Sequence, residues 1–176
     1  MLSIQKTIYL VRHAKSSWTS GAKSDFERPL SKRGLENIAE MGQKLNKLGW
    51  YPESVISSPA LRAKKTCRIL CESVDFPADS IAWNNDIYAA YMVTLLHILS
   101  AQSESNKSVM LVGHNPAMED LLLHLCGEGI WKSHAQENGK LFTTGNVAKI
   151  SFKGPWKSLT MNESKLVQLL RPKELR

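Results

Sequence analysis

The sequence has little of what marks a membrane, secreted or metal-binding protein. It holds three cysteines among 176 residues, Cys67, Cys71 and Cys126, and their spacing fits neither a metal site nor a disulfide framework. No run approaches the roughly 18 uninterrupted apolar residues of a membrane helix. Residues 1–7 are too short and too polar for a signal peptide. We therefore expect a cytoplasmic protein with no membrane partner, in which Cys67 and Cys71 are buried apolar thiols.

Acidic residues are the minority among the charged side chains. The chain has 23 Lys and Arg against 16 Asp and Glu, a formal net charge of +7. Such a surplus attracts nucleic acids, acidic membranes or phosphorylated molecules. The basic residues are dispersed, however, and form no dense run with interleaved aromatic residues. We therefore expect no nucleic-acid partner, and we interpret the positive charge as a surface that recruits phosphate groups.

No internal repeat or low-complexity tract divides the chain, whose length suits one domain with a hydrophobic core. Apolar runs alternate with amphipathic segments, which is typical of a sheet covered by helices. Strands are expected at 8–11, 54–57, 81–83, 109–112, 147–152 and 165–170, and helices from Ser31, Ser58, Met92 and Asn115. Ser58 and Asn115 each precede a proline, the pattern of an N-cap followed by proline at the first helical position. The sequence predicts a single three-layer α/β domain over residues 1–176, with a mostly parallel central sheet and helices on both faces.

Residues suited to phosphate follow three of the expected strands. Arg12 and His13 come after the first, Arg62 lies one turn into the helix after the second, and His114 follows the strand at 109–112. Ligands of open parallel sheets bind beyond the carboxyl ends of the strands, so these residues are expected to meet. Arginine binds phosphate oxygens bidentately, a neutral imidazole can accept a phosphoryl group, and a protonated one can stabilise its oxygens. Each residue alone is more often structural, but their combination at three strand ends favours a phosphate site.

Four segments resemble the motifs of the histidine phosphatase superfamily. They are LVRHAKSSWT at 10–19, DFERPLSKRG at 25–34, SSPALRA at 57–63 and VGHNP at 112–116. The second and fourth are similar to the form found in SixA-like phosphohistidine phosphatases. The matches follow in the family's order and cover most of the chain between residues 8 and 125. The resemblance implies a phosphoglycerate mutase-like fold, and we expect neither a cofactor nor a metal.

The resemblance also implies roles for five residues. His13 is the nucleophile that takes phosphate covalently, and Arg12, Arg62 and His114 hold the phosphate. Asp86 stands where the family places its acidic proton donor, and the alternative for Asp86 is a solvated loop carboxylate. We therefore expect these five residues to form the catalytic set.

Further residues of the same motifs are expected around the substrate. Ser16, Thr19 and Asn115, the last through its backbone amide, are expected to assist binding, although Thr19 stands where many family members have asparagine. Asp25 and Arg28 are as well suited to pair with each other, or to hold the loop after the first strand, as to touch substrate.

The segment 63–113 has room for a strand, a helix and connections, but not for a large lid insertion. By the resemblance, members that act on sugar phosphates carry such a lid, so we expect a shallow, open site. The sequence therefore predicts a monomeric phosphatase that hydrolyses a phosphorylated protein side chain, foremost phosphohistidine. A phosphatase of a sugar or nucleotide phosphate and, more distantly, a non-catalytic phosphate-binding or protein-binding module are the alternatives. A zinc hydrolase is weaker, because the two histidines lack a helical His-x-x-x-His pair or supporting cysteines.

Overall fold

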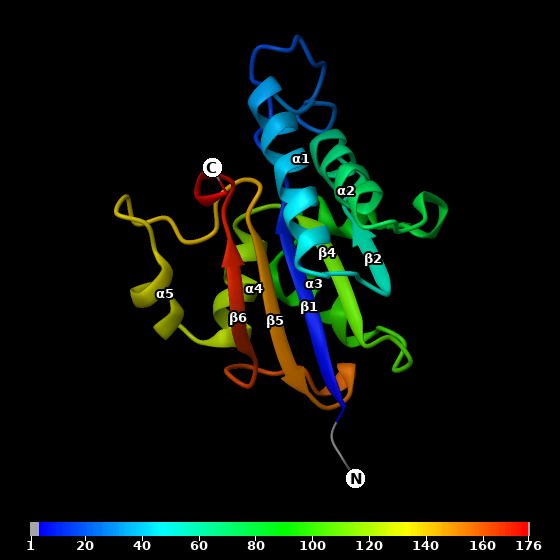
Figure 1. The fold of residues 1–176 in the computed structure, drawn as a ribbon, viewed down its shortest axis with the longest axis vertical. Coiled ribbons are helices and arrows are strands. Elements are labelled where there is room, and N and C mark those ends of the chain that lie inside the picture. The colour runs from blue at the N-terminus through cyan, green and yellow to red at the C-terminus, as the bar shows by residue number, and fades with distance from the viewer. Residues whose placement is uncertain (1–3, 176) are drawn as a thin grey trace.

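The computed structural model describes residues 4–175, which form a six-stranded sheet between helices (Figure 1). The strands are β1 (Gln5–Arg12), β2 (Ser54–Ser57), β3 (Ala82–Trp83), β4 (Ser108–Gly113), β5 (Val147–Lys153) and β6 (Lys165–Leu170). Their order in the sheet is β3-β2-β4-β1-β5-β6. The first four strands pair in parallel, whereas β5 is antiparallel to both β1 and β6. The predicted mostly parallel sheet is confirmed. Residues 1–3 of the N-terminal segment considered above lie outside the described residues.

Helices cover both faces of this sheet. They are α1 (Lys32–Lys47), α2 (Leu61–Ser73), α3 (Met92–Ser100), α4 (Ala117–Cys126) and α5 (Gly129–His134). Short 3-10 turns are η1 (Ala78–Ser80), η2 (Asn85–Ile87), η3 (Trp156–Ser158) and η4 (Pro172–Glu174). The buried side chains of α1 and α2 form one core against the sheet, and those of α3 and α4 form a second core on its other face. The three-layer arrangement is therefore confirmed.

Strand β1 joins the two cores because its side chains alternate between them. Ile8 and Leu10 pack with α3 and α4, while Tyr9 and Val11 pack with α1 and α2. A strand covered on both faces has apolar residues at every position, which is why residues 8–11 form a continuous apolar run. Strand β1 extends beyond this run at both ends, from Gln5 to Arg12.

Lys6 was not expected inside a strand, yet it is buried in β1. Its ammonium group donates to the Glu104 carboxylate at 2.7 Å and lies 4.9 Å from the centroid of the Trp156 ring. A buried charge is tolerated when it is paired in this way. The pairing allows β1 to begin before the apolar run.

Two predicted helix starts are wrong. Helix α2 begins at Leu61 rather than beside Ser58, and α4 begins at Ala117 with no side-chain cap from Asn115. The side chains of Ser58 and Asn115 make other hydrogen bonds, with His114 and with the carbonyl of Phe142 respectively. The Ser58 hydroxyl also accepts from the N–H of Ala60, the residue before α2, at 3.3 Å, so Ser58 contacts both His114 and the start of its helix, whereas the Asn115 side chain bonds away from its helix.

The segment 63–113 consists of most of α2, then η1, β3, η2, α3 and β4, with no lid insertion. Cys67 and Cys71 are buried with their sulfur atoms 3.9 Å apart, as predicted. Among residues 4–175, no helix is long and apolar enough to span a membrane. Within the same residues, no group of three or more His, Cys, Asp or Glu side chains is arranged to hold a metal ion.

Candidate active site

The carboxyl ends of β1, β2 and β4 meet at one edge of the sheet and bring three of the predicted residues together. His13 directly follows β1, and its backbone N–H donates to the Gly113 carbonyl at the end of β4 (3.0 Å). The ring centroids of His13 and His114 lie 5.1 Å apart. The guanidinium of Arg62, in the first turn of α2, reaches His13 with a distance of 3.3 Å from Nε to the imidazole Nε2.

The ring of His13 is held in one tautomer. Its Nδ1 lies 2.7 Å from the Ala14 carbonyl oxygen, and because a carbonyl only accepts hydrogen bonds, Nδ1 carries the proton. Nε2 then presents its lone pair toward Arg62. Burial, together with the positive charges of Arg62 and Arg12, lowers the pKa of His13 from 6.5 to about 4 against the opposing effect of the Ala14 hydrogen bond. The imidazole is therefore neutral at pH 7 and able to act as a nucleophile.

His114 faces the same space from β4. Its Nε2 lies 2.8 Å from the Ser58 hydroxyl, and its ring meets that of Tyr88 edge-on at 5.6 Å between centroids. Burial, followed by the charges of His13 and Arg62, lowers the pKa of His114 to about 3. In this site without a bound anion, the neutral ring of His114 is therefore favoured. A phosphate dianion beside the ring would raise that pKa again, since an opposite charge favours the protonated form.

Arg12 is anchored by a loop that sequence reasoning missed. Its Nη1 donates to the Phe142 carbonyl at 2.9 Å, and the amide nitrogen of Asn115 donates to the same oxygen at 2.9 Å. The backbone N–H of Phe142 in turn donates to the Glu119 carboxylate (2.8 Å). The loop before β5 therefore positions Arg12, and in this structure Asn115 acts there through its side chain.

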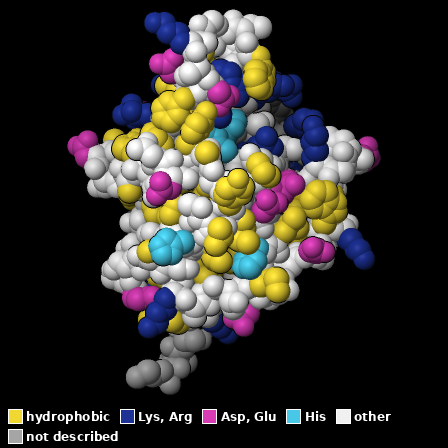
Figure 2. All heavy atoms as spheres, turned by 180° about the vertical axis from the view of Figure 1, so that it is seen from behind, with side chains coloured by type: hydrophobic (Ala, Val, Ile, Leu, Met, Phe, Trp, Pro, Cys, Tyr) yellow, Lys and Arg dark blue, Asp and Glu magenta, His cyan; other side chains and the backbone are white. Residues whose placement is uncertain are grey.

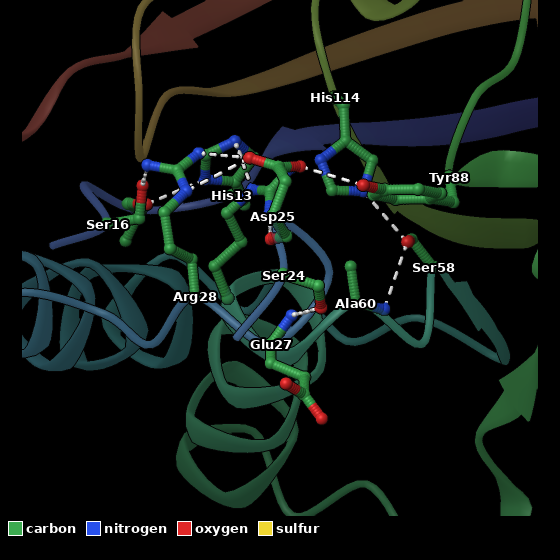
Figure 3. A network of polar contacts seen from close by, with 12 residues as sticks. His13, Ser16, Ser24, Asp25, Glu27, Arg28, Ser58, Ala60, Tyr88 and His114 are labelled. Carbon is green, nitrogen blue, oxygen red and sulfur yellow. Dashed lines mark hydrogen bonds and ion pairs between the residues drawn. The ribbon is translucent and has the colours of Figure 1, made fainter. Parts of the chain in front are cut away.

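Asp25 links Arg28, in its own loop, to Arg62, in the first turn of α2 (Figure 3). Its carboxylate accepts from Arg62 Nη2 at 3.0 Å, from the Tyr88 hydroxyl at 2.8 Å and from Arg28 Nε at 3.0 Å. Arg28 Nη1 also donates to the Ser16 hydroxyl at 2.7 Å, so Ser16 meets the site through this arginine. The Tyr88 hydrogen bond, followed by the charge of Arg62, lowers the pKa of Asp25 to about 2. The pairing of Asp25 with Arg28 is confirmed, and Asp25 also pairs with Arg62.

Two predicted residues are not brought into contact with this cluster. Thr19 is exposed, and its described contact is a backbone N–H bond to the Ser17 hydroxyl at 3.3 Å. Asp86 is exposed on η2, where its N–H donates to the Asn84 side chain at 2.8 Å. Asp86 also lines a surface groove that includes His97. Among the contacts described for residues 4–175, no hydrogen bond or ion pair links either side chain to His13.

The segment that carries Asp86 contributes Tyr88 instead. Ile87 is buried, and the next residue, Tyr88, packs edge-on against Phe26 with 5.0 Å between ring centroids. A tyrosine two positions after an expected acidic residue carries no signal of its own in the sequence. Only the fold brings its hydroxyl to Asp25.

Comparisons with known proteins agree with the fold. The family model for the histidine phosphatase superfamily (branch 1) matches residues 8–82. SixA of Agrobacterium tumefaciens, a phosphohistidine phosphatase by name, superposes with a TM-score of 0.81 at 28% identity, over 95% of this chain and 98% of that one. The protein histidine phosphatase SixA in complex with tungstate gives a TM-score of 0.79 at 23% identity, over 97% and 99% of the two chains.

A chloroplast protein of Arabidopsis thaliana, itself of uncharacterised function, is 33% identical over 136 residues. The match covers 73% of this chain but 62% of that relative, so the chain spans less than two thirds of its length. The fold is that of a SixA-like protein with the phosphoglycerate mutase-like fold. The chain belongs to the histidine phosphatase superfamily, branch 1.

Proposed function

We propose that this protein is a phosphatase that hydrolyses protein phosphohistidine through a covalent phosphohistidine intermediate on His13. The observation that carries the proposal is the fixed tautomer of His13. Its Nδ1 is bound to the Ala14 carbonyl, so a neutral Nε2 lone pair faces Arg62. A nucleophile beside a cationic group is the arrangement that phosphoryl transfer needs.

The proposed reaction has two steps. The substrate's phosphorylated ring carries a proton on its other nitrogen; His13 Nε2 attacks phosphorus as the bond from phosphorus to that ring breaks, and the ring leaves as neutral imidazole. Water then attacks the phosphorus on His13, loses a proton, and releases inorganic phosphate. Arg12, Arg62 and His114 would bind the phosphoryl oxygens in both steps, where preorganised donors stabilise the charge of the transition state.

The charge of Asp25 supports a substrate with a good leaving group. Tyr88, Arg62 and Arg28 hold this carboxylate ionised, with its pKa near 2, so at pH 7 it has no proton to donate. An alkoxide needs a proton as its bond breaks, whereas an imidazole, whose conjugate acid has a pKa of about 6.5, leaves far more readily. A site whose central carboxylate is ionised therefore suits a phosphoramidate better than an alkyl phosphate.

The surface around the site supports a protein as the bearer of the phosphate. Trp18 is 80% exposed, yet its ring is covered by Arg28, whose guanidinium carbon lies 3.6 Å from the ring centroid. Exposed tryptophan is typical of surfaces that a partner protein buries. Figure 2 shows many Lys and Arg side chains toward the end of the molecule where the loop 17–29 lies, which suits an acidic partner.

The direct test is a substrate panel. Phosphohistidine proteins, phosphoserine and phosphotyrosine peptides and sugar phosphates are compared by phosphate release under identical conditions. We expect kcat/KM for phosphohistidine to exceed the others by at least about tenfold, which corresponds to about 1.4 kcal/mol of transition-state free energy. A sugar phosphate as the best substrate would favour the small-ester phosphatase, and no turnover of any substrate would favour a binding module.

Asp86 provides a second test, because we propose it as the proton donor for poor leaving groups. Asp86→Asn is expected to lower single-turnover rates strongly on alkyl phosphates but less than about threefold on phosphohistidine, where a donor matters least. Asp79→Asn, an exposed carboxylate on η1, is the matched control. Equal losses on the two substrates would refute the leaving-group argument. An unchanged rate on both would remove Asp86 from the mechanism.

A further inference from the structure

The guanidinium of Arg62 is already engaged by three partners. Nε points at His13 Nε2 (3.3 Å), Nη1 donates to the Asp25 carbonyl oxygen (2.6 Å) and Nη2 donates to the Asp25 carboxylate (3.0 Å). The Nε contact faces the same lone pair that must attack phosphorus. Arg62 is 6% exposed, so little of its guanidinium is open to a ligand while these contacts hold. For all the N–H groups of the Arg62 guanidinium to bind phosphate, its hydrogen bonds to Asp25 and His13 have to be replaced by hydrogen bonds to phosphate oxygens.

The surroundings of the Asp25 carboxylate are those of a bound oxyanion. It accepts hydrogen bonds from two guanidinium groups and one hydroxyl, those of Arg62, Arg28 and Tyr88. Arginine forks with a hydroxyl are a common donor set for phosphate. The carboxylate thus stands where a phosphate oxygen would satisfy the same donors.

Asp25 is also free to leave this position. Its side chain is 50% exposed, and residues 18–27 of its loop are exposed throughout. Other bonds tether the two ends of the loop, from the Ser17 N–H to the Pro29 carbonyl (2.9 Å) and from the Leu61 N–H to the Phe26 carbonyl (2.9 Å). The Asp25 side chain can therefore rotate toward solvent while the loop stays in place.

We propose that Asp25 is a specificity-determining residue that competes with the substrate's phosphate for Arg62. The inference rests on the proposed function in assigning phosphate to this site. Phosphate binds with its full affinity only in the fraction of molecules whose Arg62 is released, so the apparent dissociation constant is the intrinsic one divided by that fraction. A doubly charged phosphoryl group displaces Asp25, whereas singly charged anions such as carboxylates do so poorly. The same competition returns Arg62 to Asp25 when phosphate leaves, which limits product inhibition.

The test measures binding of inorganic phosphate to the whole protein by titration calorimetry. Asp25→Asn removes the competing charge and retains the backbone carbonyl contact, so its Kd for phosphate is expected to fall about threefold or more, the scale of one partly exposed ion pair. In steady state, the Ki of phosphate as a product inhibitor falls in parallel. Asp25→Ala is expected to give the same direction, and Asp25→Glu, which keeps the charge, is expected to stay closer to wild type.

Asp79→Asn is the matched control, because it makes the same change of net charge on an exposed turn, and its Kd is expected to stay at the wild-type value. A Kd that rises or does not change in both Asp25→Asn and Asp25→Ala overturns the proposal, since Asp25 would then be a scaffold for Arg62. Phosphate binding by neither wild type nor variants overturns this inference and the phosphate site together. Tight phosphate binding without hydrolysis of phosphohistidine rejects the proposed function alone.

Discussion

His13→Ala is expected to abolish turnover and covalent labelling together. Brief incubation of the wild type with substrate carrying labelled phosphate, followed by a rapid quench, should leave phosphate on the protein. The label should survive alkali and be lost in acid, as expected of a phosphoramidate. The variant should show no label and a loss of rate beyond roughly a thousandfold, the scale seen when a nucleophile is removed.

The physical reason is that no neighbouring group can replace His13 Nε2. Arg12 and Arg62 are always protonated and cannot attack phosphorus, and His114 Nε2 is bound to Ser58. His97→Ala is the matched control, because His97 is exposed on α3 and belongs to no motif. It should leave label and rate unchanged. Label that persists in His13→Ala would refute the assignment of the nucleophile.

Arg62→Ala is expected to lower the rate on phosphohistidine about a hundredfold or more, because removing one preorganised donor from a transition state costs about 3–4 kcal/mol. Arg62→Lys should recover little of this loss, since an ammonium group cannot present the planar fork. The measurement is single-turnover hydrolysis at saturating substrate.

Arg68→Ala is the control for this prediction. Arg68 lies on the same helix α2 but is exposed, with its guanidinium carbon 5.8 Å from the centroid of the Trp83 ring. We expect Arg68→Ala to retain the wild-type rate. A loss below about threefold in Arg62→Ala would place Arg62 outside the reaction, since that is less than about 1 kcal/mol.

Local patterns were sufficient to predict most strands. The segments 54–57 and 165–170 are strands with the predicted bounds, and the apolar run 109–112 lies inside β4. The run 109–112 can be recognised because β4 is buried at every position, and burial on both faces of a parallel sheet requires apolar residues in succession. The start of β1, residues 5–7, was missed, because the burial of Lys6 there depends on Glu104, a partner 98 positions away.

Helix starts were predicted correctly where the cap is local and wrongly where it is not. Ser31 caps α1 through a hydrogen bond from the Gly34 N–H, a partner three positions on. Ser58 and Asn115 have the same cap chemistry, but they bond to His114 and Phe142. The Ser58 hydroxyl also accepts from the Ala60 N–H, yet α2 begins only at Leu61, and the local sequence shows neither distant partner.

The sequence by itself indicated that Arg12, His13, Arg62 and His114 lie together, because each stands at the end of an expected strand, directly after one or in the first turn of the helix that follows, and parallel strands end at one edge. The tertiary structure decided how that set is arranged and charged. Whether His114 is protonated depends on its burial and on the charges around it, neither of which is a property of its own segment.

Asp25 shows the same division. The sequence places it three positions from Arg28, and this local pair was predicted. Its contacts with Arg62, 37 positions away, and with Tyr88, 63 positions away, exist only because the fold brings three segments together. Hydrogen bonds and desolvation act over a few ångströms in space, whatever the separation along the chain. For that reason the residues proposed to be catalytic could be named from the sequence, while the contacts of Asp25 with Arg62 and Tyr88 could be found only in the structure.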